Sequence, residues 1–529
     1  MITKKSKYII DTQELLNEDI LKKIKAFCFQ KTDSDIKSIS NWILENWRID
    51  LTLDQDIILG YLKDWSNIEG YAIGMCRPKN NFESSILIQI FNELKIPFTI
   101  SAGRTNLTGS ATPNGGFIIS TEKLNRSKPT VKNNHVLCSP SSLLEDMRQE
   151  VLNETNSEMY YPVDPTSRKE ATIGGTISCN ASGFVPGKKG ATRHWVRGLD
   201  IILPNGKFLS CKRGEYISKN NFFQIDGNKI KIPEYNRPKI KNASGPYTGC
   251  DGDIDFVDLI VGSEGMFGLI TNCSLFIESR PRSFLDLFII LDSEKNAFSL
   301  FHFLNTQNKI ETLNAFEYFG YNCQKYMNNK QYFFNKNSEV GVYLQIPIME
   351  QSEDQKCSEW SSLLLNSNCN IHGDNIYVLN DKKSWDLFFN SRHSIPENAL
   401  KESKKLGGVS IITDIIVPKE NFAQLIEGTH RLIKNSKIEY LLFGHLGDCH
   451  LHFHMIPEKR EEITAKKTYD QIVDLSSSLG GVYSAEHGTG RRKKNDFIKC
   501  YGYEAVRQLY NIKKSLDPNE LLNSGNIIT

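Results

Sequence analysis

The stretch YPVDPTSRKEATIGGTISCNASG (residues 161–183) is the most informative for the fold, because its glycines leave backbone N–H groups unobstructed by a Cβ atom. Two similar blocks flank it, SAGRTNLTGSATPNGG (101–116) and DLIVGSEGMFGLI (258–270). One such loop is usually only a turn, but three together supply the free amides that a pyrophosphate needs. The Rossmann and Walker patterns are both absent, so the usual nicotinamide or ATP cradle is not supported.

Length and composition limit the class of protein. The chain has 529 residues and a mass of 60.2 kDa, which is more than one hydrophobic core holds. Hydrophobic content of 39%, charged content of 24% and a mean hydropathy of −0.38 exclude collagen-like, disordered and membrane-spanning classes. The 64 basic and 62 acidic residues leave a charge of +2, so we expect a small partner and no nucleic acid.

Cysteine usage and the apolar runs predict a location. The twelve cysteines form no C-x-x-C pair, which predicts free thiols in a reducing compartment. The first residues, MITKKSKYIIDTQELL, lack the apolar run of a signal peptide, and no later run is long enough to span a membrane. The sequence therefore predicts a cytoplasmic protein that meets a membrane only peripherally, through a partner.

Composition and periodicity divide the chain into four parts. Residues 1–60 are polar with apolar residues at helical spacing, which predicts an N-terminal helical extension. Residues 61–281 alternate short strands, helices and glycine-rich loops, with a hairpin turn at Asn205 and Gly206 that needs positive φ. After Pro281, long strands such as GVYLQIPI (341–348) and YLLFGHLG (440–447) alternate with helices over residues 282–500. Residues 501–529 form a last segment, and the rhythm throughout is α+β.

Histidines gather in FGHLGDCHLHFH (443–454). His450, His452 and His454 alternate, so a strand would place all three imidazoles on one face, and a loop can bring His445 beside them. Three imidazoles are costly to bury without a ligand. Glu486 follows in SAEHGTG (484–490), and this set suits Zn²⁺ or a similar divalent ion. A metal-dependent hydrolase is therefore a second hypothesis, although it would not need the three glycine-rich loops.

Seven motifs, taken in order, resemble the FAD-linked oxidases of the vanillyl-alcohol oxidase and p-cresol methylhydroxylase (PCMH) superfamily, and among them the D-lactate and D-2-hydroxyglutarate dehydrogenases. They are AGRTNLTG (102–109), residues 161–183, KGATRHWVRGLDIILPNG (189–206), DLIVGSEGMFGLIT (258–271), residues 443–454, GGVYSAEHGTGRRK (480–493) and IKKSLDPNELLNSGN (512–526). The resemblance implies a two-subdomain FAD-binding domain of the PCMH type over 61–281. An α+β substrate, or cap, domain would cover 282–500, and residues 501–529 would return to the flavin.

The same resemblance assigns noncovalently bound FAD to residues of the glycine-rich loops and the C-terminal segment. They are Gly103, Arg104, Thr105, Asn106, Leu107, Gly109, Pro165, Thr166, Thr172, Gly174, Gly175, Ser178, Asn180, Ala181, Glu264, Gly265, Gly268, Ile270 and Asn523. For Ile270 and Ala181, simple packing is an equal alternative.

The resemblance also implies an activity, the oxidation of a D-2-hydroxy acid to the 2-oxo acid. His445, His452 and Glu486 match metal ligands, His487 matches the base that removes the hydroxyl proton, and Arg392 matches the residue that binds the substrate carboxylate. Electrons would pass to a protein or quinone acceptor. The resemblance leaves a homodimer open.

Four residues depart from the family pattern. Cys449, His450 and His454 stand where relatives commonly carry Gly, Asn and Asn, and Ile412 stands where dicarboxylate-handling relatives carry Lys. The isoleucine predicts a substrate with one carboxylate, such as D-lactate or a longer D-2-hydroxy acid, because an unpaired second carboxylate would be costly to bury. The departures also leave a third hypothesis, a flavin-binding scaffold without turnover.

Overall fold

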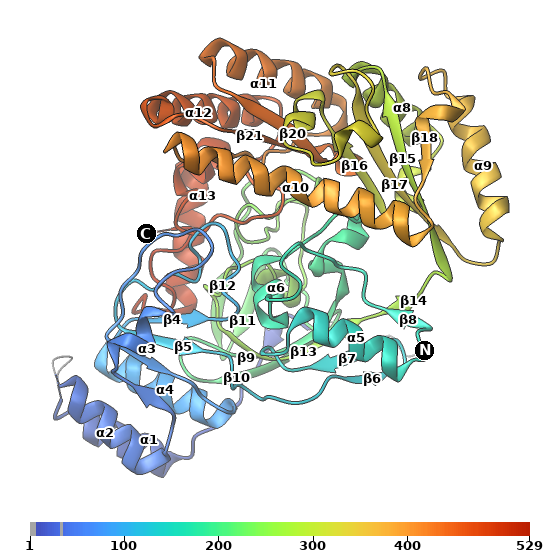
Figure 1. Ribbon diagram of the computed structural model, residues 1–529. Helices are drawn as coiled ribbons and strands as arrows, with labels where there is room; N and C mark the ends of the chain where they lie inside the picture. Colours follow the sequence, from blue (N-terminus) through green and yellow to red (C-terminus); the bar gives the residue numbers. More distant parts are fainter. Residues whose placement is uncertain (1–6, 32–34, 529) are drawn as a thin grey trace.

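The computed structural model describes residues 7–31 and 35–528 and contains helices and strands interleaved along the chain, which confirms the predicted α+β class. In Figure 1 the strands of residues 283–455 lie at the top of the molecule, and the sheets of residues 9–279 lie below them. Among the described residues, no helix combines the length and apolarity needed to cross a bilayer.

The lower part holds two main sheets. The first has the order β2-β3-β5-β4, with β3, β4 and β5 parallel. Its strands are β2 (Leu51–Thr52), β3 (Gly74–Cys76), β4 (Phe98–Ser101) and β5 (Phe117–Ser120). The second sheet is antiparallel, with the order β10-β9-β13-β7-β6. Its strands are β6 (Thr130–Lys132), β7 (His135–Cys138), β9 (Val196–Ile202), β10 (Phe208–Lys212) and β13 (Leu269–Phe276).

Helices and two small sheets complete this part. The helices are α1 (Glu18–Cys28), α2 (Ile36–Trp47), α3 (Gln55–Leu59), α4 (Asn81–Leu94), α5 (Leu144–Glu154), α6 (Ile173–Cys179) and α7 (Phe256–Ile260). The small sheets are β1 (Ile9–Ile10) with β11 (Phe222–Ile225) and β12 (Asn228–Lys231), and β8 (Met159–Tyr160) with β14 (Glu278–Ser279). The N-terminal stretch is therefore not helical throughout, because β1 pairs in parallel with β11.

The predicted hairpin turn joins β9 and β10, but its detail differs from the prediction. Pro204 and Asn205 occupy the centre of the turn, and only Gly206 has a positive φ, of 83°. The prediction of positive φ at Asn205 is wrong. The two central residues of the turn keep negative φ, and the residue after them, Gly206, takes the left-handed conformation.

The upper part is built on one antiparallel sheet of seven strands, with the order β18-β15-β17-β16-β20-β21-β19. The strands are β15 (Ser283–Leu291), β16 (Ala315–Phe319), β17 (Val340–Ile348), β18 (Ile376–Val378), β19 (Ile411–Ile412), β20 (Tyr440–His445) and β21 (His450–Met455). The helices are α8 (Glu294–Thr306), α9 (Glu353–Leu365), α10 (Lys382–Leu406), α11 (Phe422–Ser436), α12 (Glu462–Ser478) and α13 (Lys494–Leu516).

Alternation along the strands places the helices on the two faces of this sheet. Leu287 and Ile289 join the core formed with α8, α9, α11 and α12, whereas Phe288 and Ile290 pack against α10. Helix α13 then runs back to the lower part (Figure 1), and Leu521 follows it beside β4, where the Phe98 amide donates to the Leu521 carbonyl over 2.8 Å. The chain end is thus returned to the glycine-rich loops.

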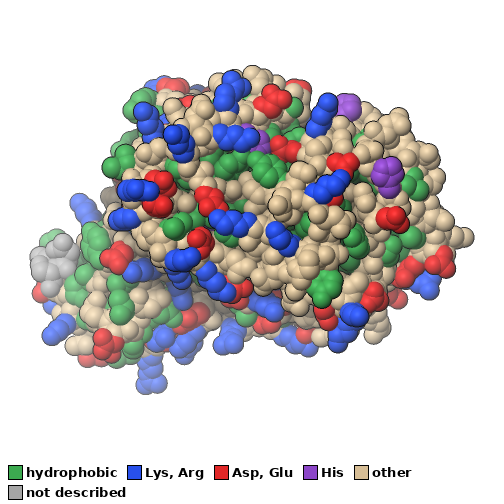
Figure 2. Space-filling view, turned by 45° about the horizontal axis from the view of Figure 1, so that its top comes forward, with side chains coloured by type: hydrophobic (Ala, Val, Ile, Leu, Met, Phe, Trp, Pro, Cys, Tyr) green, Lys and Arg blue, Asp and Glu red, His purple; other side chains and the backbone are tan. Residues whose placement is uncertain are grey.

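The surface carries no large field of one charge on the face shown in Figure 2, where Lys and Arg side chains are interspersed with Asp and Glu. This distribution agrees with the near-neutral composition. It favours a small ligand over a polyanion as the partner of this face.

Candidate active site

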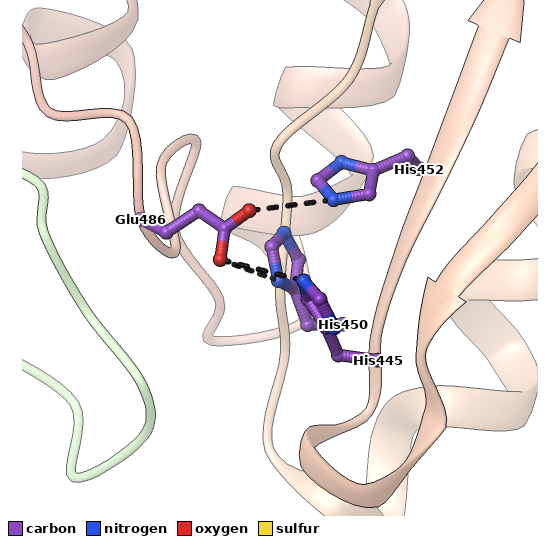
Figure 3. A group of neighbouring side chains, drawn as sticks. All are labelled: His445, His450, His452 and Glu486. Atoms are coloured by element: carbon purple, nitrogen blue, oxygen red, sulfur yellow. Dashed lines mark ion pairs between the residues drawn. The ribbon is translucent and has the colours of Figure 1, made fainter. Parts of the chain in front are cut away.

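Three histidines and one glutamate converge at the end of the seven-stranded sheet (Figure 3). Glu486 Oε2 lies 3.6 Å from His445 Nε2 and 3.9 Å from His450 Nδ1, and Glu486 Oε1 lies 3.5 Å from His452 Nε2. The four ligand atoms lie within 4.8 Å of one another. The structure therefore brings the predicted ligands His445, His452 and Glu486 together, and adds His450 to them.

Each histidine is held from outside the cluster by an oxygen atom. Glu317 Oε1 lies 2.6 Å from His445 Nδ1, and the Thr413 carbonyl oxygen lies 2.9 Å from His452 Nδ1. Asp414 Oδ1 lies 3.1 Å from His450 Nε2. Such outer acceptors fix the ring and its tautomer and direct the other nitrogen inward, as they do around protein metal centres.

The donor set fits a divalent cation. The buried Nδ1 of His450 makes no hydrogen bond, whereas Glu486 Oε2 pairs with Lys241 Nζ at 3.1 Å. Buried polar atoms without partners are costly unless a ligand satisfies them. Three imidazoles and a carboxylate are the ligands that Zn²⁺ prefers.

The charged side chains around the cluster carry a small negative excess. Four carboxylates and three cations surround the cluster: Glu317, Asp414, Asp448 and Glu486 against Lys241, Arg392 and Lys493. One negative charge is left over. Burial lowers the pKa of His445, but the Glu317 carboxylate outweighs it and raises that pKa to about 9, so a proton on this ring balances the charge.

Asp414 lies beneath the cluster and is not among the site residues predicted from the sequence. This fully buried carboxylate lies 2.9 Å from Lys493 Nζ and 3.4 Å from His487 Nδ1, and it accepts the His487 amide over 3.0 Å. Burial raises its pKa, but His487 and Lys493 together hold it well below the ordinary value. Asp414 therefore fixes both the ring and the backbone of His487.

His487 stands beside this network in a state suited to a base. Burial lowers its pKa, so the ring is neutral near pH 7. Its Nδ1 faces Asp414, and its Nε2 lies 3.6 Å from Glu486 Oε1. The ring is stacked on that of His452, with centroids 5.8 Å apart.

Arg392 and the departing residues occupy different places. Arg392, on α10, lies 3.1 Å from Glu317 Oε2, so it joins the cluster through that carboxylate. His454 shares the face of β21 with His450 and His452, but its ring bonds the Ser410 hydroxyl away from Glu486. Ile412 lies opposite it on the edge strand β19 with 39% of its surface exposed. Cys449 is buried in the turn before β21 with a φ of 59°.

The loop of residues 103–109 offers a run of free amides. Within residues 7–31 and 35–528, the five backbone N–H groups of residues 103–107 donate no hydrogen bond. The side chain of Asn106 turns the loop by accepting from the Thr108 amide over 2.8 Å. Consecutive free amides suit a pyrophosphate, so this loop fits the cofactor predicted for it.

Six other predicted cofactor residues make contacts within the protein itself. Thr172 caps α6 by accepting the Gly175 amide, and Asn523 links the loops, because it donates to the Glu264 carbonyl and accepts the Ile100 amide. Others act in packing: Ile270 lies in the buried strand β13, and a Cβ atom at Gly268 would meet Ile201. In the same way Gly174 contacts Pro140, and Asn180 ends α6 with a φ of 48°.

Glu264 connects the cofactor loops to the active-site loop. Its carboxylate accepts the amides of Thr489 and Gly490, each over 2.7 Å. Asn106 Nδ2 donates to the His487 carbonyl over 3.3 Å from the other side. The loop that carries Glu486 and His487 is thus tied to two of the glycine-rich loops.

A Glu264→Gln variant is expected to lose much of the pH dependence of stability below pH 7. Burial raises the Glu264 pKa from 4.5 to about 7, so its contribution to stability is present below about pH 4.5 and is lost as the pH rises to 7. The loss is about 3 kcal/mol, which unfolding of wild type and variant between pH 5 and 8 measures. Parallel pH profiles would show that Glu264 does not ionise in this range.

Family sequence models match both parts of the chain. The FAD binding domain matches residues 72–212, and the C-terminal domain of FAD linked oxidases matches residues 289–527. The chain belongs to the FAD-linked oxidases. Its FAD-binding part is of the type predicted, and FAD is the cofactor that this family membership supports.

Relatives cover most of the chain at modest identity. A D-lactate dehydrogenase of Anaerostipes hadrus is 27% identical over 88% of this chain and 92% of its own. A D-lactate dehydrogenase of Archaeoglobus fulgidus is 24% identical over 85% and 90%. The mitochondrial D-2-hydroxyglutarate dehydrogenase of Danio rerio is 24% identical over 89% and 81%.

Solved structures confirm the fold. The structure of p-cresol methylhydroxylase with substrate bound aligns with a TM-score of 0.66 at 15% identity over 98% of each chain. An alkyldihydroxyacetonephosphate synthase aligns with a TM-score of 0.63 at 12% identity over 97% of this chain and 85% of its own. The FAD-linked oxidase therefore has the PCMH-type architecture predicted from its motifs.

Proposed function

We propose that this FAD-linked oxidase is a dehydrogenase that oxidises a D-2-hydroxy acid to the 2-oxo acid and passes the electrons to a protein or quinone acceptor. The position of His487 carries the proposal. Its ring is held by Asp414 beside the histidine cluster, and its backbone carbonyl is bonded by Asn106 of the loop with free amides. A base, a metal-ligand set and a cofactor loop thus meet at one residue.

His487 would take the hydroxyl proton of the substrate. Because Nδ1 faces the ionised Asp414, the proton of the neutral ring sits on Nδ1, and Nε2 is free to accept. Asp414 then stabilises the imidazolium that forms. This arrangement supplies general base catalysis without a large movement of the ring.

Arg392 would bind the substrate carboxylate. One of its guanidinium nitrogens contacts Glu317, and the others remain for a bidentate pair. Since Glu317 also holds His445, the carboxylate-binding group and the metal ligands are fixed to one another.

His445, His452 and Glu486 would hold a divalent metal. A metal held there would supply Lewis-acid polarisation of the substrate hydroxyl, and bound FAD would supply the hydride acceptor. The relatives named D-lactate and D-2-hydroxyglutarate dehydrogenase support this assignment of reaction class.

The proposal is tested with purified holoprotein, an artificial electron-accepting dye and a panel of D- and L-2-hydroxy acids. The expected result is dye reduction by at least one D-acid, with loss of activity after chelation and return with Zn²⁺. Dye reduction by no acid would leave the scaffold hypothesis. Turnover that resists complete metal removal would take the histidine cluster out of the reaction.

A further inference from the structure

A cavity of about 320 Å³ adjoins the active site between the lower and upper parts of the molecule. Residues of α5 and of the stretch 160–168 line one side, and residues of β15, β17 and α10 line the other. Its size lies in the range of pockets that bury a ligand much larger than a three-carbon acid.

One end of this cavity reaches the residues that the proposed function assigns to the carboxylate. Glu317 and Arg392 both line it, and Glu317 contacts His445 on its other side. A substrate bound at Arg392 could therefore extend into the cavity.

Eight of the twenty residues that line the cavity are aromatic, with the rings of Phe184, Phe284, Trp385, Phe388 and Phe389 among them. Tyr343, also in the wall, stacks on Phe388 with centroids 5.0 Å apart. Such walls favour rings and other bulky apolar groups, because aromatic contacts add to the burial of apolar area.

The acidic groups of the cavity are already neutralised. Asp164 lies 3.1 Å from an Arg148 nitrogen and 2.8 Å from an Arg168 nitrogen, and Glu317 pairs with Arg392. Arg280 also lines the cavity and has no ion pair among the described residues. The cavity thus presents aromatic rings beside arginines, of which Arg280 has no carboxylate partner among the described residues.

We propose that the cavity holds the side chain of the substrate, and that the substrate is a D-2-hydroxy acid with an aromatic or bulky apolar tail. This proposal rests on the proposed function and names the substrate class. The probes are D-3-phenyllactate, D-lactate and D-2-hydroxyglutarate, compared by kcat/KM in the dye assay. D-3-phenyllactate is expected to exceed D-lactate by at least about 10-fold, because even one methylene in an apolar pocket is worth about 10-fold or more.

A tryptophan at Leu152, which lines the cavity from α5, should fill part of it. Leu152→Trp is expected to lower the ratio of kcat/KM for D-3-phenyllactate over D-lactate by about 10-fold. The matched control is Asp146→Trp on the same helix, where the side chain is exposed and does not line the cavity. Flavin content and melting temperature of both variants reveal any folding defect.

Two results would overturn the aromatic-tail proposal and leave the reaction class standing. One is a wild-type kcat/KM for D-lactate equal to or above that for D-3-phenyllactate. The other is a preference for D-2-hydroxyglutarate that Arg280→Gln abolishes. If no D-2-hydroxy acid reduces the dye, the proposed function fails instead.

His450 carries a second, independent inference. Its side chain is fully buried, and its Nδ1 makes no hydrogen bond. Nε2 faces Asp414 Oδ1 at 3.1 Å, and Nδ1 faces Glu486 Oε2 at 3.9 Å. This is the arrangement of His445 and His452, in which one nitrogen meets an outer oxygen and the other points to Glu486 (Figure 3).

We infer that His450 is a fourth protein ligand of the metal, held by Asp414 in the manner of a carboxylate–histidine–metal triad. A site with three protein ligands keeps an open position, whereas a fourth ligand closes it further and retains the ion more strongly. The wild-type protein should therefore release the metal more slowly than a variant that lacks the His450 imidazole.

The test compares wild type with His450→Asn. Asparagine is the residue that relatives commonly carry at this position. Zn²⁺ content and the rate of Zn²⁺ loss to EDTA are measured on holoprotein, together with the visible spectrum of the Co²⁺-substituted form. The variant is expected to lose Zn²⁺ at least about 10-fold faster and to show a changed Co²⁺ spectrum at unchanged flavin content.

His454→Asn is the matched control, because His454 lies on the same face of β21 but bonds Ser410. It should retain Zn²⁺ and the Co²⁺ spectrum of wild type. Equal Zn²⁺ retention and equal spectra in His450→Asn and wild type would overturn the inference. Wild-type protein that binds neither Zn²⁺ nor Co²⁺ would overturn it as well.

Discussion

A His487→Gln variant is expected to bind FAD as wild type does and yet to turn over its substrate about 10²- to 10⁴-fold more slowly, the range of general base catalysis. Glutamine retains the size and one polar contact of the side chain but cannot take the hydroxyl proton at the position of Nε2. The measurement is kcat in the dye assay, with flavin content determined on the same samples.

His454→Gln serves as the control for His487→Gln, because that ring lies outside the Glu486 cluster. It is expected to change kcat by less than about 3-fold. A kcat of His487→Gln within a few-fold of wild type, at full flavin content, would remove His487 from its assigned role.

Replacing Asp414 by alanine is expected to destabilise the protein by about 3–5 kcal/mol, the usual effect of breaking a buried ion pair. The variant leaves Lys493 buried without a carboxylate, and it removes the acceptor of the Ser484 hydroxyl and the His487 amide. Turnover should fall too, since the His487 ring loses its support. The denaturant midpoint and kcat are the measurements.

A second variant separates the charge effect from the loss of packing. Adding Lys493→Met to Asp414→Ala removes the uncompensated cation, so the double variant should recover part of the lost stability. If Asp414→Ala unfolds at the wild-type midpoint, the buried network does not stabilise this site.

The sequence predicted those parts of the site whose residues lie close together in the chain. The alternating histidines of residues 450–454 predicted a shared strand face, and that prediction is correct because a strand has a period of two. Glu486 could be added because it lies next to His487 in the glycine-containing loop SAEHGTG (484–490) and matches a metal ligand of the resembled family. The family motifs then predicted the cofactor and the fold.

The residues that hold the ligands in place were missed because their partners are distant in sequence. Glu317 is 128 residues from His445, and Asp414 is 73 residues from His487. Only tertiary pairing of β16 with β20 brings the first pair together. The available signal was a carboxylate within an apolar run, AFEYF (315–319) and IITDIIV (411–417), since such a group is buried only with a partner.

Several predicted cofactor residues also make packing or loop contacts within the protein, and their assignment to FAD stays a prediction. The sequence does not reveal the packing of Gly268, because a glycine before a buried strand looks the same whether it approaches a ligand or another strand. Glu264 matched a motif, but its carboxylate binds the amides of residues 489 and 490.

The most direct test is anaerobic addition of one D-2-hydroxy acid and its L-enantiomer to the purified flavoprotein, followed by its visible spectrum. The D-acid is expected to bleach the oxidised flavin band with the formation of about one equivalent of 2-oxo acid per flavin, whereas the L-acid leaves the band unchanged. A flavin that no D-2-hydroxy acid bleaches, in protein that contains both FAD and metal, would contradict it.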